Sequence, residues 1–424
     1  MHLSTRAVLI FVLLLIDISV ATSFAAESAP TWRLSGARIY PAPDADPITD
    51  GVLLLRAGKV AAIGARDAIK PPPGVRELEC QGGVITAGYQ NSHVHFTGEQ
   101  FSNAQDALPA DLERHLGEML TRYGFTTVVD TASDRNNTLA LRSRIESGKV
   151  RGPRILTVGW GLYPHNGIPF YLADLPKPLL DRLPQPATPD EALAIVRENL
   201  QAGVDGTKLF VATPQSDQSV KLMSNAIARA AADETHAAGK LVMAHPTNLD
   251  GVRIALGAKV DILVHTTLGV ETAWPAPLVK QLIEQKTSVV PTLQLWGYEL
   301  NKRKVPEPVQ QRLIAATLAQ LKGFADAGGQ VLFGTDVGYM TEFDPTAEYE
   351  LMSKAGLTPM QILASLTTAP AARWDEADRR GRLTIGMDAD IIVLDADPAE
   401  DAKNFAKVRC VFRGAKPLYA RSTQ

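Results

Sequence analysis

The feature that most constrains the fold is an alternation of short apolar runs with longer helical patterns from about residue 85 onward. The apolar runs have the length of strands and lie near 85–95, 125–131, 154–160, 204–211, 240–246, 259–266, 287–293 and 330–337. Helical patterns lie between them, at 111–123, 189–202, 219–238, 278–285 and 308–327. Strands in regular alternation with helices predict an α/β fold, a (β/α)8 TIM-like barrel.

Polar residues stand where several of these apolar runs stop. Four of the eight histidines do so: His93, His95, His245 and His265. Lys208 and Asp336 end two further runs. His93 and His95 flank a single valine, so on a strand both imidazoles point to the same face. Taken alone, this pair would also fit a barrel core or a hydrated loop. The six positions together predict a metal site at the carboxyl ends of the strands, where barrels of this kind carry their active-site residues.

The two ends of the chain have a different pattern. Residues 31–80 and 381–424 contain short β patterns separated by turn residues. Because the two ends of a barrel lie close together, these segments are expected to join into one small β-sandwich domain. The expected division is a β-sandwich half at 27–84, the barrel at 85–375 and the second β-sandwich half at 376–424.

Residues 1–25 have the organisation of a signal peptide. Arg6 precedes an apolar stretch from Ala7 to Ile16, and Ser23-Phe24-Ala25 offers small residues for cleavage before Ala26. The apolar stretch is shorter than the roughly 20 residues that a membrane-spanning helix needs. We therefore expect an exported, periplasmic protein without membrane attachment after cleavage; an uncleaved anchor is the alternative.

Charge and cysteine content limit the partners and the covalent chemistry. The formal net charge is −3 and no block is rich in Lys or Arg, so nothing indicates a nucleic-acid partner. Cys80 and Cys410 both fall in the flanking β segments. Export would permit a disulfide between them, and two free, buried thiols are the alternative.

Three segments together resemble the amidohydrolase superfamily, metal-dependent hydrolases built on a (β/α)8 barrel. Gly51–Gly64 resembles the N-terminal β motif of that family, and Thr86–His95 resembles its first barrel strand. Gly381–Ile391 resembles its C-terminal return. The lysine on the fourth strand makes the chain similar to imidazolonepropionase-like and prolidase-like members. Asn91 stands where members usually carry an acidic residue, but that position is not a metal ligand in the family pattern.

The resemblance implies a binuclear metal centre and a role for each polar residue. His93, His95 and Asp336 would hold the buried metal, His245 and His265 the outer metal, and Lys208 would bridge the two. An ammonium has no lone pair, so the bridge requires Lys208 to react with CO2 and form a carbamate. The alternative for Lys208 is a salt bridge inside the barrel, for example to Asp336. The two divalent metal ions would be Zn²⁺ first, with Mn²⁺, Co²⁺, Fe²⁺ or Ni²⁺ fitting the same geometry.

The same resemblance implies the chemistry. A metal-bridging hydroxide would attack the substrate, with Asp336 as general base and then general acid, or as a structural ligand only. Tyr163 and His165, in the loop after the third strand, are candidate substrate-binding residues; packing of an aromatic lid is the alternative. Trp296, Tyr298 and Tyr339 are weaker candidates for lining the pocket.

The expected activity is hydrolysis of a C–N bond in an amide or small peptide-like, non-phosphate substrate. Hydrolysis of a lactone, ester or phosphotriester at the same centre is the first alternative. A catalytically dead, exported binding protein is an alternative of another class. The expected partners are a small molecule or short peptide, and the sequence is compatible with a homo-oligomer.

Overall fold

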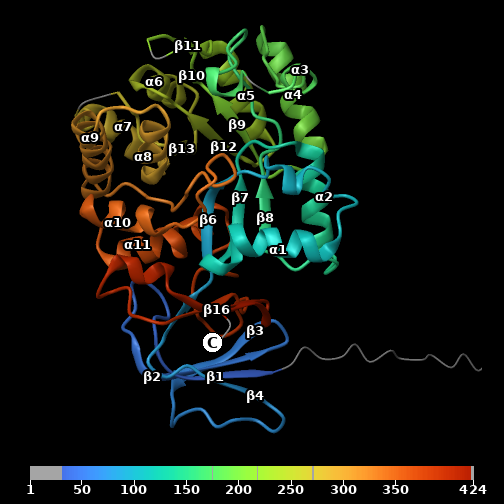
Figure 1. The fold of residues 1–424 in the computed structure, drawn as a ribbon, viewed down its shortest axis with the longest axis vertical. Coiled ribbons are helices and arrows are strands. Elements are labelled where there is room, and N and C mark those ends of the chain that lie inside the picture. Colours follow the sequence, from blue (N-terminus) through green and yellow to red (C-terminus); the bar gives the residue numbers. More distant parts are fainter. Residues whose placement is uncertain (1–30, 174, 217, 270–271, 422–424) are drawn as a thin grey trace, which may run out of the picture.

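The computed structural model describes residues 31–173, 175–216, 218–269 and 272–421. The expected signal peptide at 1–25 lies outside these residues. Figure 1 shows strands from both ends of the chain gathered at one end of the molecule, with the parallel strands and their helices above them. Within the described ranges, no helix combines the length and the apolar character that crossing a membrane requires.

In the described part of the chain, strands from both ends form one eight-stranded sheet. Its strands are β1 (Trp32–Ile39), β2 (Ile48–Arg56), β3 (Lys59–Ala65), β4 (Arg76–Glu79), β5 (Val84–Ala87), β15 (Ile391–Leu394), β16 (Val408–Arg413) and β17 (Lys416–Ala420). Their order is β17-β16-β15-β5-β1-β2-β3, with β4 paired to β1. The antiparallel pairing of β5 with β15 joins the two ends of the chain, although residues 85–87 were expected in the first barrel strand.

Apolar side chains from both halves of this terminal sheet share one core. Leu34 and Leu53 from the first half pack in the same buried cluster as Val393 from the second. Cys80 and Cys410 belong to this cluster, and both are free thiols. Burial raises the pKa of Cys80 to about 11 and that of Cys410 to about 12, so both thiols stay protonated at neutral pH. Of the two alternatives, the structure therefore has the unbridged cysteines.

The strands above the terminal sheet are parallel and form two groups. One group contains β6 (Tyr89–Val94), β7 (Phe125–Asp130) and β8 (Arg154–Thr157), and the other contains β9 (Gly206–Phe210), β12 (Leu241–His245), β13 (Ile262–Val264) and β14 (Ser288–Val290). The strand expected at 85–95 is divided at Gly88. The Gly88 N–H still donates to Asp390 of the terminal sheet, whereas the Tyr89 N–H already donates to Gly124 beside β7.

The eighth expected strand, 330–337, is not a continuous strand, but its backbone forms hydrogen bonds with both groups of parallel strands. The Leu332 N–H donates to a carbonyl of β14 (2.9 Å), and the Phe333 carbonyl accepts from an N–H of β6 (2.7 Å). Asp336 has a φ of 66°, which interrupts the extended backbone. At the other junction, the Leu162 N–H after β8 donates to a carbonyl of β9 (2.9 Å). Backbone hydrogen bonds therefore cross both junctions between the two groups.

Helices follow most of the parallel strands. Their bounds are α1 (Pro109–Met119), α2 (Arg135–Glu146), α3 (Lys177–Leu180), α4 (Pro189–Gln201), α5 (Asn225–Ala237), α6 (Leu249–Gly257), α7 (Ala276–Glu284), α8 (Leu293–Lys302), α9 (Glu307–Asp326), α10 (Thr346–Lys354), α11 (Pro359–Leu366) and α12 (Thr368–Arg373). The helix expected at 219–238 begins later, because the Ser224 side chain caps α5 and β11 (Val220–Leu222) pairs with β10 (Ala212–Pro214). Gly203 follows α4 with a φ of 93°, as expected for a helix end.

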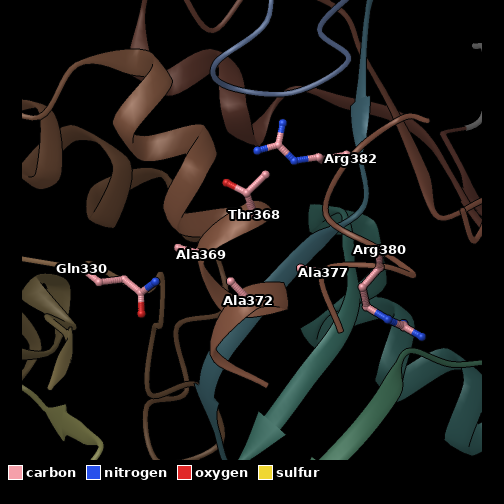
Figure 2. A pocket seen from close by; sticks show the side chains of 7 residues that line it. All are labelled: Gln330, Thr368, Ala369, Ala372, Ala377, Arg380 and Arg382. Carbon is pink, nitrogen blue, oxygen red and sulfur yellow. The ribbon is translucent and has the colours of Figure 1, made fainter. Parts of the chain in front are cut away.

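The amino ends of the parallel strands face the terminal sheet through a network of ion pairs. A cavity of about 320 Å³ lies here, lined by residues of α12 and of the segment that leads back to the sheet. Figure 2 shows the side chains that line it. Arg380, which lines it, lies 3.2 Å from Glu376, 3.0 Å from Asp388 and 3.4 Å from Asp390. Arg382 on the opposite wall pairs with Asp44 (2.6 Å). The arginines of this cavity are thus already neutralised by the protein, which indicates a structural role.

Candidate metal centre

The six polar residues predicted from the strand ends lie at the carboxyl ends of the parallel strands. His93 is in β6 and His95 follows it, Lys208 is in β9, His245 ends β12, His265 follows β13, and Asp336 is in the 330–337 segment. Parallel strands present their carboxyl ends at one edge, and this common edge is what allows residues far apart in sequence to meet.

Asp336 is at the middle of the group. Its Oδ1 lies 2.9 Å from Nε2 of His95 and 3.2 Å from Nε2 of His93, and its Oδ2 lies 3.9 Å from Nε2 of His265. The Nε2 atoms of His93 and His95 are 3.1 Å apart. The ring centroid of His245 is 4.7 Å from that of His265. The structure thus brings five of the six predicted ligands into one contiguous cluster.

The hydrogen bonds of two histidines determine which ring nitrogen faces the cluster. Nδ1 of His95 lies 3.2 Å from the Ala132 carbonyl, which can only accept, so Nδ1 carries the proton. Nδ1 of His265 lies 2.6 Å from the Thr292 hydroxyl, whose own proton goes to the Pro291 carbonyl. With Nδ1 as the donor, each ring turns Nε2 toward Asp336, the arrangement that metal-binding histidines usually have.

The donor atoms fit a metal ion. His93, His265 and Asp336 each offer one ligand atom within 4.8 Å of the others. Among the described residues, Oδ1 of Asp336 is buried and accepts no hydrogen bond. Nitrogen lone pairs and a carboxylate oxygen that converge at about 3 Å repel one another, and a divalent cation between them would remove this repulsion.

Burial holds the histidines in the state that binds metal. It lowers the pKa of His93 and of His245 to about 3 each, and that of His265 well below its ordinary value. Burial alone would raise the pKa of Asp336, but His93 and His95 beside it hold that pKa well below the ordinary range. At neutral pH these three imidazoles are therefore neutral and the Asp336 carboxylate is ionised.

Two of the cluster residues have strained backbones. His265 has a φ of 76° and Asp336 a φ of 66°, in the left-handed region that residues with a side chain rarely adopt. Such conformations cost on the order of 1–3 kcal/mol each and concentrate at functional sites. Neighbouring strands hold them in place: the His265 N–H donates to Val290, and the Asp336 N–H donates to His93.

Lys208 is buried in the same region without an acidic partner. Its side chain is 1 % exposed, and no carboxylate oxygen of the described residues lies within 4.0 Å of Nζ. The salt bridge to Asp336 considered above is therefore not formed. Burial lowers the pKa of Lys208 to about 7, although Asp336 and Asp130 act in the opposite direction. Nζ lies 5.3 Å from the ring centroid of Phe210, which in turn packs on His245.

The two candidate substrate-binding residues have different surroundings. The ring of Tyr163 stacks on Phe210 at 4.2 Å with an interplanar angle of 10°, so it is one ring away from His245. The Tyr163 side chain is buried, burial raises the pKa of its phenol, and among the described residues its hydroxyl has no hydrogen-bond partner. His165 is exposed, and its Nδ1 lies 3.3 Å from the Gln185 carbonyl on the same loop.

Further aromatic residues border the centre. The ring of Trp296 lies 5.9 Å from that of His265, and its Nε1–H donates to Thr266. Tyr339 packs on Tyr171 at 5.6 Å and donates its hydroxyl proton to Glu299 (2.7 Å). This agrees with the expectation that Trp296 and Tyr339 lie near the site.

Two residues near the centre were not predicted from the sequence. Thr292, with a φ of 44°, accepts from His265, and nothing in its local pattern marks that contact. Asp130 is the last residue of β7 and lies in the same kind of strand-end position as Asp336. The rule that selected the six ligands would have found it.

Comparison with known proteins identifies the family of the chain. The sequence profile of the amidohydrolase family matches residues 84–417. The ochratoxinase of Aspergillus niger is 23% identical over 407 residues, which cover 87% of this chain and 82% of that protein. A candidate prolidase from Bifidobacterium longum has a similar fold, with a TM-score of 0.77 and 22% identity over 92% of this chain and 95% of that one.

A Xaa-Pro dipeptidase, solved with methionine bound in its active site, also has a similar fold. Its TM-score is 0.77 at 22% identity, over 92% of this chain and the whole of the other. At such identities the structural similarity supports the fold alone, whereas the family profile covers most of the chain. The chain therefore belongs to the amidohydrolase family, which confirms the expected hydrolase class, acting on carbon–nitrogen bonds.

Proposed function

We propose that this protein is a metal-dependent hydrolase of an amide or small peptide-like bond, acting with two divalent metal ions. The convergence of His93 and His95 on Oδ1 of Asp336 carries this proposal, because that buried oxygen lacks a hydrogen-bond donor among the described residues. The amide class is supported by the family and by the names of its relatives, an ochratoxinase and a dipeptidase.

We also infer the finer architecture. The two groups of parallel strands would form one closed (β/α)8 barrel, with 330–337 as its eighth strand. Hydrogen bonds across both junctions support this closure. The terminal sheet would fold over its shared apolar cluster as a β-sandwich. The domains would then be 27–84 with 376–424, and the barrel at 85–375.

The metal ligands are assigned by position. His93, His95 and Asp336 would hold the buried metal, His245 and His265 the outer metal, and Lys208, as a carbamate, both. A buried lysine amine without a carboxylate partner supports the bridging role, because carboxylation would replace a costly isolated cation with a two-oxygen ligand. Nitrogen and oxygen donors suit Zn²⁺ first, with Mn²⁺, Co²⁺, Fe²⁺ and Ni²⁺ as alternatives.

The protein's own groups would then carry the proton transfers. When bound, the two metal ions would supply a hydroxide at neutral pH and polarise the substrate carbonyl. Asp336, ionised and aimed at the centre, would accept a proton and return it to the leaving amine. Tyr163, with its free hydroxyl beside the centre, would donate a hydrogen bond to the substrate. His165, on the exposed loop, would contact the distal part of a small-molecule or short-peptide substrate.

The test is a substrate screen combined with metal removal. We expect turnover of N-acyl amino acids or dipeptides, loss of turnover after dialysis against a chelator, and recovery with Zn²⁺. His115→Ala is the control, because His115 lies on α1 away from the centre and should leave both activity and metal dependence unchanged. Turnover of phosphotriesters, lactones or esters with no amide cleaved would favour the first alternative. Metal-independent binding without any turnover would favour the dead binding protein.

We further propose that the protein is exported to the periplasm and cleaved before Ala26. The support is the organisation of residues 1–25 in the sequence. N-terminal sequencing of the protein from a periplasmic extract should begin at Ala26. An uncleaved chain retained in the membrane fraction would favour the anchor instead.

A further inference from the structure

A second buried carboxylate, Asp130, lies behind the metal centre and outside the assigned ligands. It ends β7, and its side chain is fully buried. Among the described residues, no basic nitrogen lies within 4.0 Å of its oxygens. Its partners are two hydroxyls: Ser133 Oγ lies 2.5 Å from Oδ1, and Thr157 Oγ1 lies 2.9 Å from Oδ2. Burying a carboxylate without a cation is costly, so a role beyond packing is indicated.

The donors and acceptors around Asp130 require a carboxylate. Ser133 Oγ accepts the Phe96 N–H (2.8 Å), so its own proton is free for Asp130. Thr157 Oγ1 accepts the Gly159 N–H (3.1 Å), so its proton is also free for Asp130. Both oxygens of Asp130 therefore accept. An asparagine would turn an N–H donor toward one of these hydroxyls, which could then only accept and would lose the acceptor for its own proton.

The same turn fixes His95 at two points. Ser133 binds the N–H of Phe96, the residue directly after His95. The Ala132 carbonyl accepts Nδ1–H of His95 (3.2 Å), and Ala132 has a φ of 114°, a conformation that an alanine rarely adopts. Asp130 therefore anchors, through Ser133, the turn whose carbonyl orients the imidazole of His95.

We propose that Asp130 is a positioning residue, which holds the turn 131–133 so that His95 presents Nε2 to the metal centre. The inference rests on the proposed metal-dependent function. Asp130 would touch neither metal nor substrate, and its effect would pass through the orientation of His95. Partners that orient a ligand in this way typically change metal affinity by 10–100-fold when they are removed.

Asp205 offers a matched control. It also contacts Thr157, but through the backbone N–H (2.9 Å), and it pairs with Arg142 (2.7 Å) at the amino end of β9. Asp130→Asn and Asp205→Asn make the same chemical change on opposite sides of one threonine. Only Asp130→Asn is expected to change the orientation of His95.

The experiment measures zinc affinity by competition with a chromogenic chelator, together with the melting temperatures of metal-free and zinc-loaded protein. For Asp130→Asn we expect zinc binding weakened by about 10–100-fold, with Asp205→Asn within about twofold of wild type. The zinc-induced rise in melting temperature should shrink only in Asp130→Asn. A Ser133→Ala variant removes the hydroxyl that links Asp130 to the Phe96 N–H, so it should weaken zinc binding at least as much, and it replaces Asp130→Asn if that variant does not fold.

Unchanged zinc affinity in Asp130→Asn and Ser133→Ala would overturn the role of Asp130 while leaving the proposed function intact. An equal loss in Asp205→Asn would also overturn it, since the effect would then be general destabilisation. A wild-type chain that binds no divalent metal would overturn the proposed function itself, and the role of Asp130 with it.

Discussion

In the described part of the chain, buried charged side chains have ion-pair partners at the amino ends of the parallel strands, whereas two such side chains at the carboxyl ends lack them. At the amino ends, Arg380 lies within 3.4 Å of three carboxylates, those of Glu376, Asp388 and Asp390. At the carboxyl ends, Lys208 has no carboxylate within 4.0 Å among the described residues, and Asp130 has no basic group within that distance. An uncompensated buried charge is costly, and it fits the roles proposed for these two residues, a metal ligand for Lys208 and a positioning residue for Asp130. We therefore call the amino ends, with the Arg380 network, the structural end, and the carboxyl ends, with the metal centre, the functional end.

Asp336→Asn should have the largest effect on the functional end. The amide keeps the shape but removes the negative charge among His93, His95 and His265. We expect a fall in turnover of about 10³-fold, within the range for loss of a general base. Steady-state kinetics with the amide found in the substrate screen measure it.

Asp326→Asn is the control for this change, because Asp326 pairs with Lys322 on the exposed face of α9. Its turnover should equal that of wild type. If Asp336→Asn turned over substrate as fast as this control, Asp336 would be neither ligand nor proton carrier.

Arg380→Met should break the structural end without touching the functional one. It removes the common cation of Glu376, Asp388 and Asp390, of which the first two keep Arg154 and Lys59 and the buried Asp390 keeps no other ion pair among the described residues. Breaking a buried pair in this way typically costs about 3–5 kcal/mol of unfolding free energy. Denaturant unfolding measures this loss. Metal content per chain should stay unchanged.

Arg382→Met, on the same cavity, is the matched comparison (Figure 2). Arg382 is more exposed and pairs with Asp44 alone, so its removal should cost less than about 1 kcal/mol. Equal losses of unfolding free energy in the two variants would show that Arg380 is no more important than an exposed ion pair. A loss of metal in Arg380→Met would show that the two ends of the strands are coupled.

Acid should destabilise the metal-free protein because buried histidines of the metal centre must then bind protons. The pKa of His93 and of His245 is lowered to about 3 in the folded state, against an ordinary value near 6.5, so the unfolded chain binds more protons between these limits. Stability is therefore full above about pH 6.5 and falls toward pH 3, by up to about 1.4 kcal/mol per pH unit for each histidine.

Denaturant unfolding of the chelated protein at several pH values measures this slope. His93→Ala should reduce this slope. A stability that does not change between pH 7 and pH 5 would contradict the burial of neutral imidazoles.

Tyr163→Phe should have the smallest effect. It removes only the hydroxyl, which has no protein partner among the described residues, and keeps the stacking on Phe210. Stability should stay within about 0.5 kcal/mol of wild type. The specificity constant kcat/KM should fall by about tenfold, the value of roughly one hydrogen bond to substrate. An unchanged kcat/KM would remove Tyr163 from the substrate site.

The strand-end pattern located most of the site, because it depends on local features alone. An apolar run predicts the strand, and the polar residue at its end marks the carboxyl end of that strand, as His245 does on β12. The same rule would have found Asp130 on β7 if it had been applied to acidic residues throughout. Thr292 could not be found in this way, since its contact with His265 depends on a left-handed turn after β14.

The differences in the fold have a common cause. Residues 85–95 form one continuous apolar pattern, yet partners from distant segments divide it, Asp390 on one side of Gly88 and Gly124 on the other. Likewise, Val220–Leu222 pairs with β10 rather than extending α5. Pairing with another segment overrides the local pattern in both cases, a distant segment for 85–95 and a neighbouring strand for Val220–Leu222.

The most direct test of the central claim is the metal content per chain of the wild-type protein and of Lys208→Ala, purified without chelator and measured by elemental analysis. Lys322→Ala, which removes an exposed lysine of α9, is the control. We predict about two divalent ions per chain in the wild type and in Lys322→Ala, as for a two-metal hydrolase, falling to about one or fewer in Lys208→Ala. Equal metal content in all three proteins, or none in the wild type, would contradict the carbamate-bridged centre.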